Sequence, residues 1–243
     1  MQIYIIRHGL PDYANDNLLP DGIKQAKLVA KKLKVIDFDK IYVSSQGRAV
    51  ETSKYILEYQ KAKPIIVDWA REDLGAKYFR DNSKEVNQWY FWVDKYASLF
   101  NSEQIYKLGN DWFEHDMIKQ TKMKDGYLKM AKVVDNLLDQ LGYKHDRENH
   151  LYFKYKDVAE NVAIIAHGGF AYSFISNLLD IPYPMFVSTH SIMDLTGITI
   201  IELLGDVCKA KLLEYNNVSH LKKRYPYKKI PNNPTYVKDS LVK

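Results

Sequence analysis

Two short apolar segments, each ending in histidine and glycine, constrain the fold of this chain more than any other feature. Residues 2–6 run without a charge into Arg7-His8-Gly9, and residues 162–166 run into His167-Gly168-Gly169. Such runs are typical of strands buried on both faces of an α/β sheet. Ligands of open α/β sheets bind at the carboxyl ends of the strands. Arg7, His8 and His167 are therefore predicted to lie at a binding edge.

The rest of the chain alternates between helical and strand-like spacing of apolar residues. Helices are expected from Asp21, behind Arg48, and over residues 128–141 and 170–178, and strands over residues 38–43, 65–67, 197–203 and 207–215. This alternation predicts an α/β fold: a three-layer α/β/α sandwich around a mostly parallel central sheet.

Residues 76–124 differ in character, because they hold three of the four tryptophans (Trp89, Trp92 and Trp112). We expect a single domain over residues 1–225, with residues 76–124 as a helical, aromatic-rich insertion folded over the sheet. Within it, residues 86–100 are expected to be helical. Residues 226–243 begin with Pro226 and also contain Pro231 and Pro234, and they are expected to be an irregular basic C-terminal tail.

The insertion allows two compatible interpretations. Its aromatic side chains either only pack against the rest of the protein, or also form a lid that shapes a pocket. Three residues at its start, Lys77, Tyr78 and Arg80, are candidates for contacting a second anionic group of a ligand.

Composition excludes several classes of protein. The chain has 243 residues, no uncharged apolar run long enough to span a bilayer, and one cysteine, Cys208, which excludes an internal disulfide and a multi-cysteine metal site. The first residues lack a secretory signal pattern, so a cytoplasmic location is expected. The net charge of +5 suits an anionic substrate as well as solvated lysines. We expect no membrane partner and, despite the basic residues near the C-terminus, no nucleic acid.

Several of the residues at the expected binding edge suit a phosphate group. Arg48, at the start of a helix, offers a guanidinium and nearby helix N-terminal amides. Gly9 and Gly168 lack Cβ atoms, so their backbone amides can approach an anion closely. With Arg7 and His167, these residues are the predicted phosphate-binding set.

The ordered motifs resemble those of the histidine phosphatase superfamily, which includes the cofactor-dependent phosphoglycerate mutases. Arg7-His8-Gly9 is similar to its signature, and Ile165-Ala166-His167-Gly168-Gly169 to its second histidine motif. Four further segments resemble family motifs: residues 19–26 (LPDGIKQA), 42–52 (YVSSQGRAVET, with Ser45 where proline is usual), 69–75 (WAREDLG) and 217–221 (NVSHL). Ordered motifs in matching structural contexts are far more specific than a lone Arg-His-Gly.

The resemblance implies a mechanism that needs neither a metal nor a cofactor. His8 would attack phosphorus and form a phosphohistidine, with its second ring nitrogen bonded to a backbone carbonyl such as that of Gly9. Arg7, Arg48 and His167 would stabilise the phosphoryl oxygens. Glu72 would serve as general acid, although spacing alone leaves Asp73 and Glu51 open.

The predicted function is metal-independent hydrolysis of a small phosphate monoester through a phosphohistidine on His8. One alternative is a cofactor-dependent phosphoglycerate mutase, whose usual residues are replaced here by Leu10 and Gly169-Phe170. Another is a non-catalytic phosphate-binding protein, because a fold does not by itself establish an activity. The expected partner is a small phosphorylated substrate. The oligomeric state is left open, a homodimer included.

The remaining histidines are assigned to other roles. His190 either approaches the phosphate pocket or is structural, and His220 is expected to be structural. The other three, His115, His145 and His150, are expected to be exposed. No pair of histidines or carboxylates has convincing metal-ligand spacing. Cys208 is expected to be a small buried apolar residue.

Overall fold

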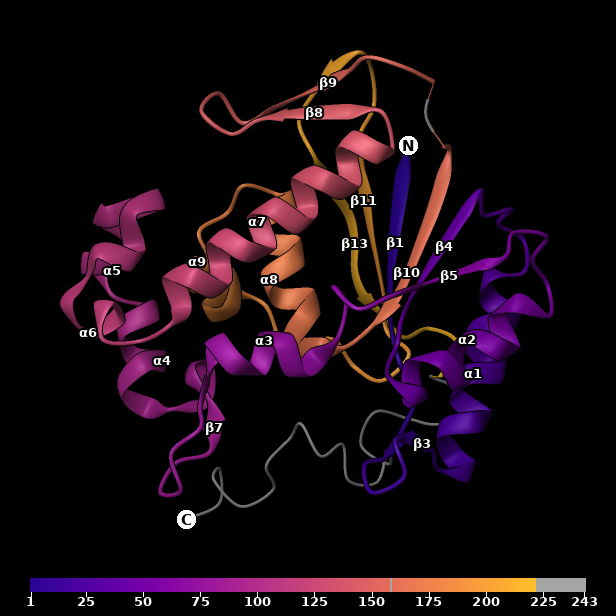
Figure 1. Ribbon diagram of the computed structural model, residues 1–243, viewed down its shortest axis with the longest axis horizontal. Coiled ribbons are helices and arrows are strands. Elements are labelled where there is room, and N and C mark those ends of the chain that lie inside the picture. Colours follow the sequence, from indigo (N-terminus) through magenta and orange to yellow (C-terminus); the bar gives the residue numbers. More distant parts are fainter. Residues whose placement is uncertain (158, 222–243) are drawn as a thin grey trace.

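The computed structural model describes residues 1–157 and 159–221, and its centre is a six-stranded sheet in the order β13-β11-β1-β10-β4-β5 (Figure 1). Neighbours among β1, β10, β4 and β5 are parallel. At one side of the sheet, β11 pairs in antiparallel fashion with both of its neighbours, β1 and β13. The strands are β1 (Gln2–Arg7), β4 (Lys40–Ser44), β5 (Pro64–Val67), β10 (Asn161–Ala166), β11 (Ile198–Glu202) and β13 (Lys211–Asn217). The predicted mostly parallel central sheet is confirmed.

The pairing of β1 with β10 brings the two histidine motifs together. Arg7 lies opposite Ala166 in the parallel register, so His8 and His167 follow at the same position of neighbouring strands. Both strands are buried beyond their first residue, as the apolar runs predict. The strand ends therefore meet at one edge of the sheet.

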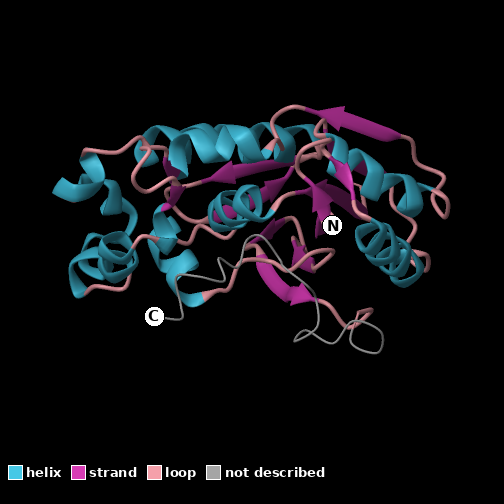
Figure 2. Ribbon diagram, turned by 90° about the horizontal axis from the view of Figure 1, so that it is seen from below, coloured by secondary structure: helices cyan, strands magenta, loops and turns pink. Residues whose placement is uncertain are grey.

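Helices cover both faces of the sheet (Figures 1 and 2). Alternate residues of β1 belong to different cores. Tyr4 and Ile6 pack with α1 (Pro20–Leu33) and α2 (Gly47–Leu57). Ile3 and Ile5 belong to the larger core, which includes α7 (Met123–Gln140) and α8 (Gly168–Leu178). Because successive side chains of a strand point to opposite faces, this division is the three-layer sandwich that the sequence predicts.

Helix α1 illustrates how the local sequence determines an element. Pro20 occupies the first turn, where its missing N–H costs no hydrogen bond. Ala26, Val29, Ala30 and Leu33 then recur at spacings of three and four and are all buried. The helix therefore buries one apolar stripe against the sheet.

Residues 76–124 form short elements that pack on helices. They include the end of α3 (Glu72–Phe79), β6 (Arg80–Asp81), β7 (Gln88–Trp89), a 3-10 turn (Tyr90–Trp92), α4 (Asp94–Phe100), α5 (Glu103–Leu108), a second 3-10 segment (Gly109–Glu114), α6 (Asp116–Lys119) and the start of α7. The expected helix over residues 86–100 is wrong in its first half, because Gln88–Trp89 pairs with Arg80–Asp81 as a strand.

The same segment also lies beside the sheet rather than over it. Helices α4 and α5 pack on α9 (Tyr183–Thr189), and α6 packs on the start of α7. The completely buried Trp112 anchors this contact, with its ring edge-on to Tyr127. That the segment is an insertion in a single domain over residues 1–225 stays a prediction, and the expected tail at residues 226–243 lies outside the described residues.

His145 lies in a small outer sheet and is buried, although the sequence predicts that it is exposed. The strands β8 (Tyr143–Asp146), β9 (Leu151–Lys154) and β12 (Val207–Cys208) form this sheet. The His145 imidazole is completely buried, with its ring nitrogens 2.9 Å from Asp135 Oδ1 and 2.8 Å from Asp180 Oδ2. The expectation of an exposed His145 is therefore wrong, because carboxylates far away in the chain surround it.

The structure also bears on the predictions for Cys208 and for membrane-spanning helices. Cys208 is buried, as expected. In the described part of the chain, none of the helices combines the length and apolar character needed to cross a membrane.

Candidate active site

The imidazoles of His8 and His167 lie next to each other at the carboxyl ends of β1 and β10. Their ring centroids are 5.1 Å apart, and both residues are almost completely buried. The matched register of the two strands produces this contact, so local apolar patterning places two residues 159 positions apart in one site.

The environment of His8 selects one form of its ring. Nδ1 lies 2.7 Å from the carbonyl oxygen of Gly9, which can only accept, so Nδ1 donates a proton. Burial and the positive charges of Arg7 and Arg48 hold the pKa of His8 well below its usual value. The ring is consequently neutral, and its lone pair is on Nε2. This is the tautomer that the sequence analysis expects for a nucleophile.

Two guanidiniums surround the histidines. Arg7 donates from Nη1 to the Met193 carbonyl, and a Cβ placed on Gly168 would lie only 3.3 Å from its Cζ. Arg48, the second residue of α2, forms an ion pair with Asp16. The other carboxylate oxygen of Asp16 accepts the Gly47 N–H at 2.6 Å, which fixes the start of α2 beside the ion pair.

His167 is held by a residue from a third strand. Ser44, the last residue of β4, places its hydroxyl 2.8 Å from His167 Nε2. His167 Nδ1 is buried and has no hydrogen-bond partner among the described residues. Burial lowers the pKa of His167 well below its usual value, and so do the neighbouring imidazole of His8, since two protonated rings would repel each other, and the charges of Arg48 and Arg7. This imidazole too is neutral, with one nitrogen unused.

Glu72 joins the group from the first turn of α3. Its carboxylate oxygens accept the N–H groups of Gly169 and Phe170, both at 3.0 Å, and its own N–H donates to Gln46 Oε1 at 2.7 Å. Burial raises the pKa of Glu72, although those two hydrogen bonds and the charges of Arg7 and Arg48 oppose the rise. A carboxyl group with a raised pKa is suited to donate a proton near neutral pH.

The two other candidate acids are engaged elsewhere. Asp73 forms a two-pronged ion pair with Arg71, which lowers the pKa of that carboxyl group. Glu51 accepts the N–H of Leu18 at 2.6 Å. The geometry therefore favours Glu72 over both of the alternatives that spacing leaves open.

Gly9 has a different use from the one predicted. A Cβ at this position would lie 2.6 Å from the carbonyl oxygen of Gly22, so the loop needs glycine for packing. Its N–H donates to Thr52 Oγ1 at 3.0 Å, and its carbonyl binds His8. In this structure the Gly9 amide is thus committed to orienting the loop rather than directed at an anion.

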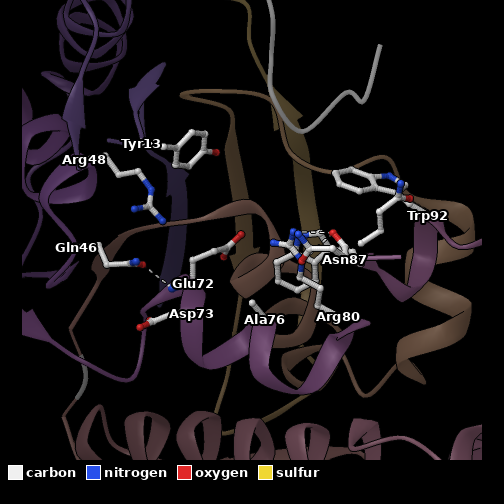
Figure 3. A pocket seen from close by; sticks show the side chains of 11 residues that line it. Tyr13, Gln46, Arg48, Glu72, Asp73, Ala76, Arg80, Asn87 and Trp92 are labelled. Atoms are coloured by element: carbon white, nitrogen blue, oxygen red, sulfur yellow. Dashed lines mark hydrogen bonds between the residues drawn. The ribbon is translucent and has the colours of Figure 1, made fainter. Parts of the chain in front are cut away.

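A cavity of about 510 Å³ opens beside these residues (Figure 3). Arg48, Glu72, Tyr13 and Gln46 lie at one end, and Arg80, Asn87 and Trp92 lie at the other. The remaining lining residues are Asp73, Ala76, Gln88 and Trp89. Much of this wall belongs to the aromatic segment 76–124, so that segment shapes a pocket as well as packing.

Of the other residues that the sequence suggests for the site, one lines the cavity and the rest do not. Arg80 lines the cavity, whereas Tyr78 and the exposed Lys77 are not among its lining residues. His190 stacks on Phe186 at 4.3 Å between centroids, and His220 bonds Thr196. Both have structural contacts.

Across residues 1–157 and 159–221, no cluster of three or more histidine, cysteine, aspartate or glutamate side chains is suited to a metal ion.

Three residues of the site escaped the sequence analysis: Ser44, Asp16 and Thr52. Ser44 and Thr52 are common polar residues within the 42–52 motif, and Asp16 lies shortly before the 19–26 motif. Ser44 could have been predicted from its position at the end of a buried strand, because polar side chains there lie at the binding edge of the sheet. Asp16 lies in a turn and offers no comparable pattern.

Comparisons with known proteins find similarity to one family. The model of the histidine phosphatase superfamily (branch 1) matches residues 3–114, which include Arg7, His8, Arg48 and Glu72. A relative from Hydrogenobacter thermophilus, provisionally named phosphoserine phosphatase 2, is 22% identical over 228 residues, covering 90% of this chain and 97% of the relative.

Two other proteins extend the comparison. The 2,3-bisphosphoglycerate-dependent phosphoglycerate mutase of Enterococcus faecalis is 37% identical over 76 residues, 26% of this chain and 33% of the mutase. The crystal structure of phosphoserine phosphatase from Entamoeba histolytica in complex with 3-phosphoglyceric acid has the same fold. It superposes with a TM-score of 0.56 at 20% identity, over 90% of this chain and 98% of that one.

The family match falls on the strand ends and helix starts that assemble the site. The long relative and the shared fold extend the similarity across β10 and His167. Over residues 3–114 this chain is similar to the histidine phosphatase superfamily (branch 1), and over most of its length it shares the fold of the phosphoserine phosphatase from Entamoeba histolytica.

Proposed function

We propose that this protein hydrolyses a small phosphate monoester through a phosphohistidine on His8, without a metal ion. The observation that carries the proposal is the neutral His8 ring, whose Nδ1 is bonded to Gly9 and whose Nε2 is unprotonated beside two guanidiniums. An unprotonated imidazole nitrogen is the form that can attack phosphorus.

Binding of the phosphate group is supported by the charges at the site. Arg7 and Arg48 supply positive charge that other phosphoryl-transfer enzymes obtain largely from metal ions. His167 Nδ1 and Arg48 Nε are buried without hydrogen-bond partners in the described part of the chain, and phosphoryl oxygens would fit both. The ion pair with Asp16 would loosen as the substrate's negative charge enters.

In the first chemical step, His8 Nε2 bonds to phosphorus while the bond from phosphorus to the ester oxygen breaks. Glu72 gives its proton to the departing oxygen, which leaves as an alcohol. The raised pKa of Glu72 supports this role, because it favours the protonated form that an acid needs. Arg7, Arg48 and His167 stabilise the oxygens as charge redistributes.

In the second step, water replaces His8 on phosphorus. The carboxylate of Glu72 accepts a proton from that water as its oxygen bonds to phosphorus and the bond from nitrogen to phosphorus breaks. Phosphate is released and Glu72 is again protonated. One residue thus serves as acid and then as base.

The first test replaces His8 with alanine. We expect loss of para-nitrophenyl phosphate turnover and of the acid-labile, base-stable phosphoenzyme that the native protein forms, because no ring nitrogen remains to bond phosphorus. His115→Ala, which removes a surface imidazole bonded to Gln104, is the matched control. EDTA should leave native activity intact. Turnover retained by His8→Ala would refute the covalent role, and loss of activity with EDTA would refute metal independence.

The second test separates Glu72 from its neighbour. Glu72→Gln removes the proton but keeps the shape, so turnover of an alkyl phosphate should fall about 100-fold or more. Turnover of para-nitrophenyl phosphate should fall much less, since that leaving group departs without a proton. Asp73→Asn is the control. Equal losses on both substrates, or a larger leaving-group dependence in Asp73→Asn, would assign the acid elsewhere.

A further inference from the structure

One face of α3 forms a wall of the active-site cavity. Glu72 and Ala76 lie one turn apart on α3, Arg80 is the first residue after the helix, and all three line the cavity. Residues four apart lie on the same side of a helix, and eight residues advance about 12 Å along its axis. The small Ala76 leaves space between the proposed acid at one end and Arg80 at the other (Figure 3).

Arg80 is anchored without being neutralised. Its Nε and Nη2 donate to the Asn87 carbonyl oxygen at 3.2 and 2.7 Å, across the β6–β7 hairpin. Among the described residues no carboxylate forms an ion pair with it, whereas Arg48 has Asp16 and Arg71 has Asp73. The hairpin therefore fixes a guanidinium at the cavity wall with a full positive charge.

The surroundings of Arg80 define the chemistry of its ligand. Asn87 brings an amide group to the same end of the cavity, and Trp92 provides an apolar edge (Figure 3). Gln88, the next residue along the chain, also lines the cavity. Asp73, another charged lining residue, is compensated by Arg71. A single uncompensated cation with neutral hydrogen-bonding neighbours complements a single negative charge, and guanidinium groups match carboxylates in shape.

We propose that Arg80 is a specificity-determining residue, which binds a carboxylate on the alcohol part of the substrate. This inference rests on the proposed function, which places the phosphate at the Arg48 and Glu72 end. The substrate class is then a phosphate monoester of a small hydroxy acid, with the phosphate and the carboxylate at opposite ends of the cavity. The side chains of Glu72 and Arg80 both line the cavity, and their backbone positions are about 12 Å apart along the direction of α3, so a small ligand lies between them.

The test compares two ligands that differ only at the far end. 3-Phosphoglycerate carries a carboxylate where glycerol 3-phosphate carries a hydroxymethyl group. Dissociation constants are measured by calorimetry on His8→Ala protein, which cannot turn the ligands over by the proposed route. We expect 3-phosphoglycerate to bind about tenfold or more tightly, the typical contribution of a charge-assisted hydrogen bond.

Substitution of Arg80 tests whether this residue causes the preference for 3-phosphoglycerate over glycerol 3-phosphate. Adding Arg80→Gln, which keeps a donor for the Asn87 carbonyl, should bring the ratio of the two dissociation constants close to one. Adding Lys84→Ala is the matched control, because it removes an exposed positive charge from the same hairpin outside the cavity lining. In that protein the ratio should persist.

Three results would overturn the proposal: equal binding of the two ligands, a ratio that survives Arg80→Gln, or a ratio that falls equally in Lys84→Ala. Tighter binding of fructose 1,6-bisphosphate than of 3-phosphoglycerate would also overturn it, by indicating a second phosphate rather than a carboxylate. Failure of the proposed function is seen separately, as absence of para-nitrophenyl phosphate turnover by the native enzyme, and the binding ratio does not depend on that assay.

Discussion

Replacement of His145 with phenylalanine should destabilise the protein by about 3 kcal/mol below pH 6 and by much less at pH 9. The completely buried imidazole lies between Asp135 and Asp180, with a carboxylate oxygen within hydrogen-bond distance of each ring nitrogen. Both nitrogens can donate only if the ring is protonated. Phenylalanine keeps the stacking on Tyr152, whose ring centroid is 4.2 Å away, but removes both donors.

The magnitude follows from those two hydrogen bonds. A hydrogen bond to a charged group contributes about 1.5–3 kcal/mol. The Asp180 carboxylate is only 10% exposed, so its bond belongs in that range, whereas Asp135 is 38% exposed and solvent weakens its bond. Arg147 continues to bind both carboxylates in the variant. A total of about 3 kcal/mol corresponds to a fall in Tm of about 6–12 °C for a chain of this size.

The pH dependence has a defined sign. Burial by itself would lower the pKa of His145, but the hydrogen bonds to Asp135 and Asp180 outweigh it, and the pKa is raised. The folded protein therefore holds this proton more tightly than the unfolded chain. The stabilisation is fully present below the ordinary histidine pKa of about 6.5 and is lost as the pH rises through the raised value.

Urea unfolding followed by tryptophan fluorescence, at pH 6 and at pH 9, measures the effect in the native protein and in His145→Phe. Subtracting the two proteins removes the contributions of other titrating groups. His115→Phe is the control, since the described hydrogen-bond partners of His115 include no carboxylate. A penalty for His145→Phe that is equal at the two pH values, or larger at pH 9, would show that the buried ring is not charged in the fold.

Three further substitutions test contacts in and around the site. Gly169→Ala should cost about 1–3 kcal/mol of stability, because its Cβ would lie 2.2 Å from Cη2 of the buried Trp89. Gly75→Ala, whose Cβ would be 3.8 Å from the same ring, should instead stabilise α3 by about 0.5–1 kcal/mol, and thermal melts that show equal losses would contradict the crowding argument. Ser44→Ala should lower kcat/KM for para-nitrophenyl phosphate about tenfold, since the buried His167 loses its described hydrogen-bond partner. An unchanged kcat/KM would show that Ser44 does not orient the ring.

Predictions from local pattern succeeded where the pattern itself carries the structure. The apolar runs before His8 and His167 correspond to adjacent parallel strands, and the stripe ending at Leu33 corresponds to the buried face of α1. The prediction of a helix over residues 86–100 was wrong in its first half. Gln88 and Trp89 pair with a strand eight residues earlier, and such pairing is a property of two segments rather than of one.

His145 shows the same limit for side chains. It lies among polar residues, a context that usually indicates exposure, yet its partners are Asp135 on α7 and Asp180 after α8. A buried polar side chain is recognised by the groups that satisfy it. Those groups are 10 and 35 residues away along the chain, and no local pattern connects them.

The sequence by itself determined the two buried strands that end at His8 and His167 and the edge of the sheet at which these residues lie, because apolar periodicity and strand ends are local properties. Only the tertiary structure decided which carboxylate is available and what lies opposite it. Glu72 is selected by amide groups nearly a hundred residues later, and Arg80 faces the cavity because a hairpin holds it there. The physical reason is that pKa and charge compensation depend on distance in space, which the fold sets after the local elements have formed.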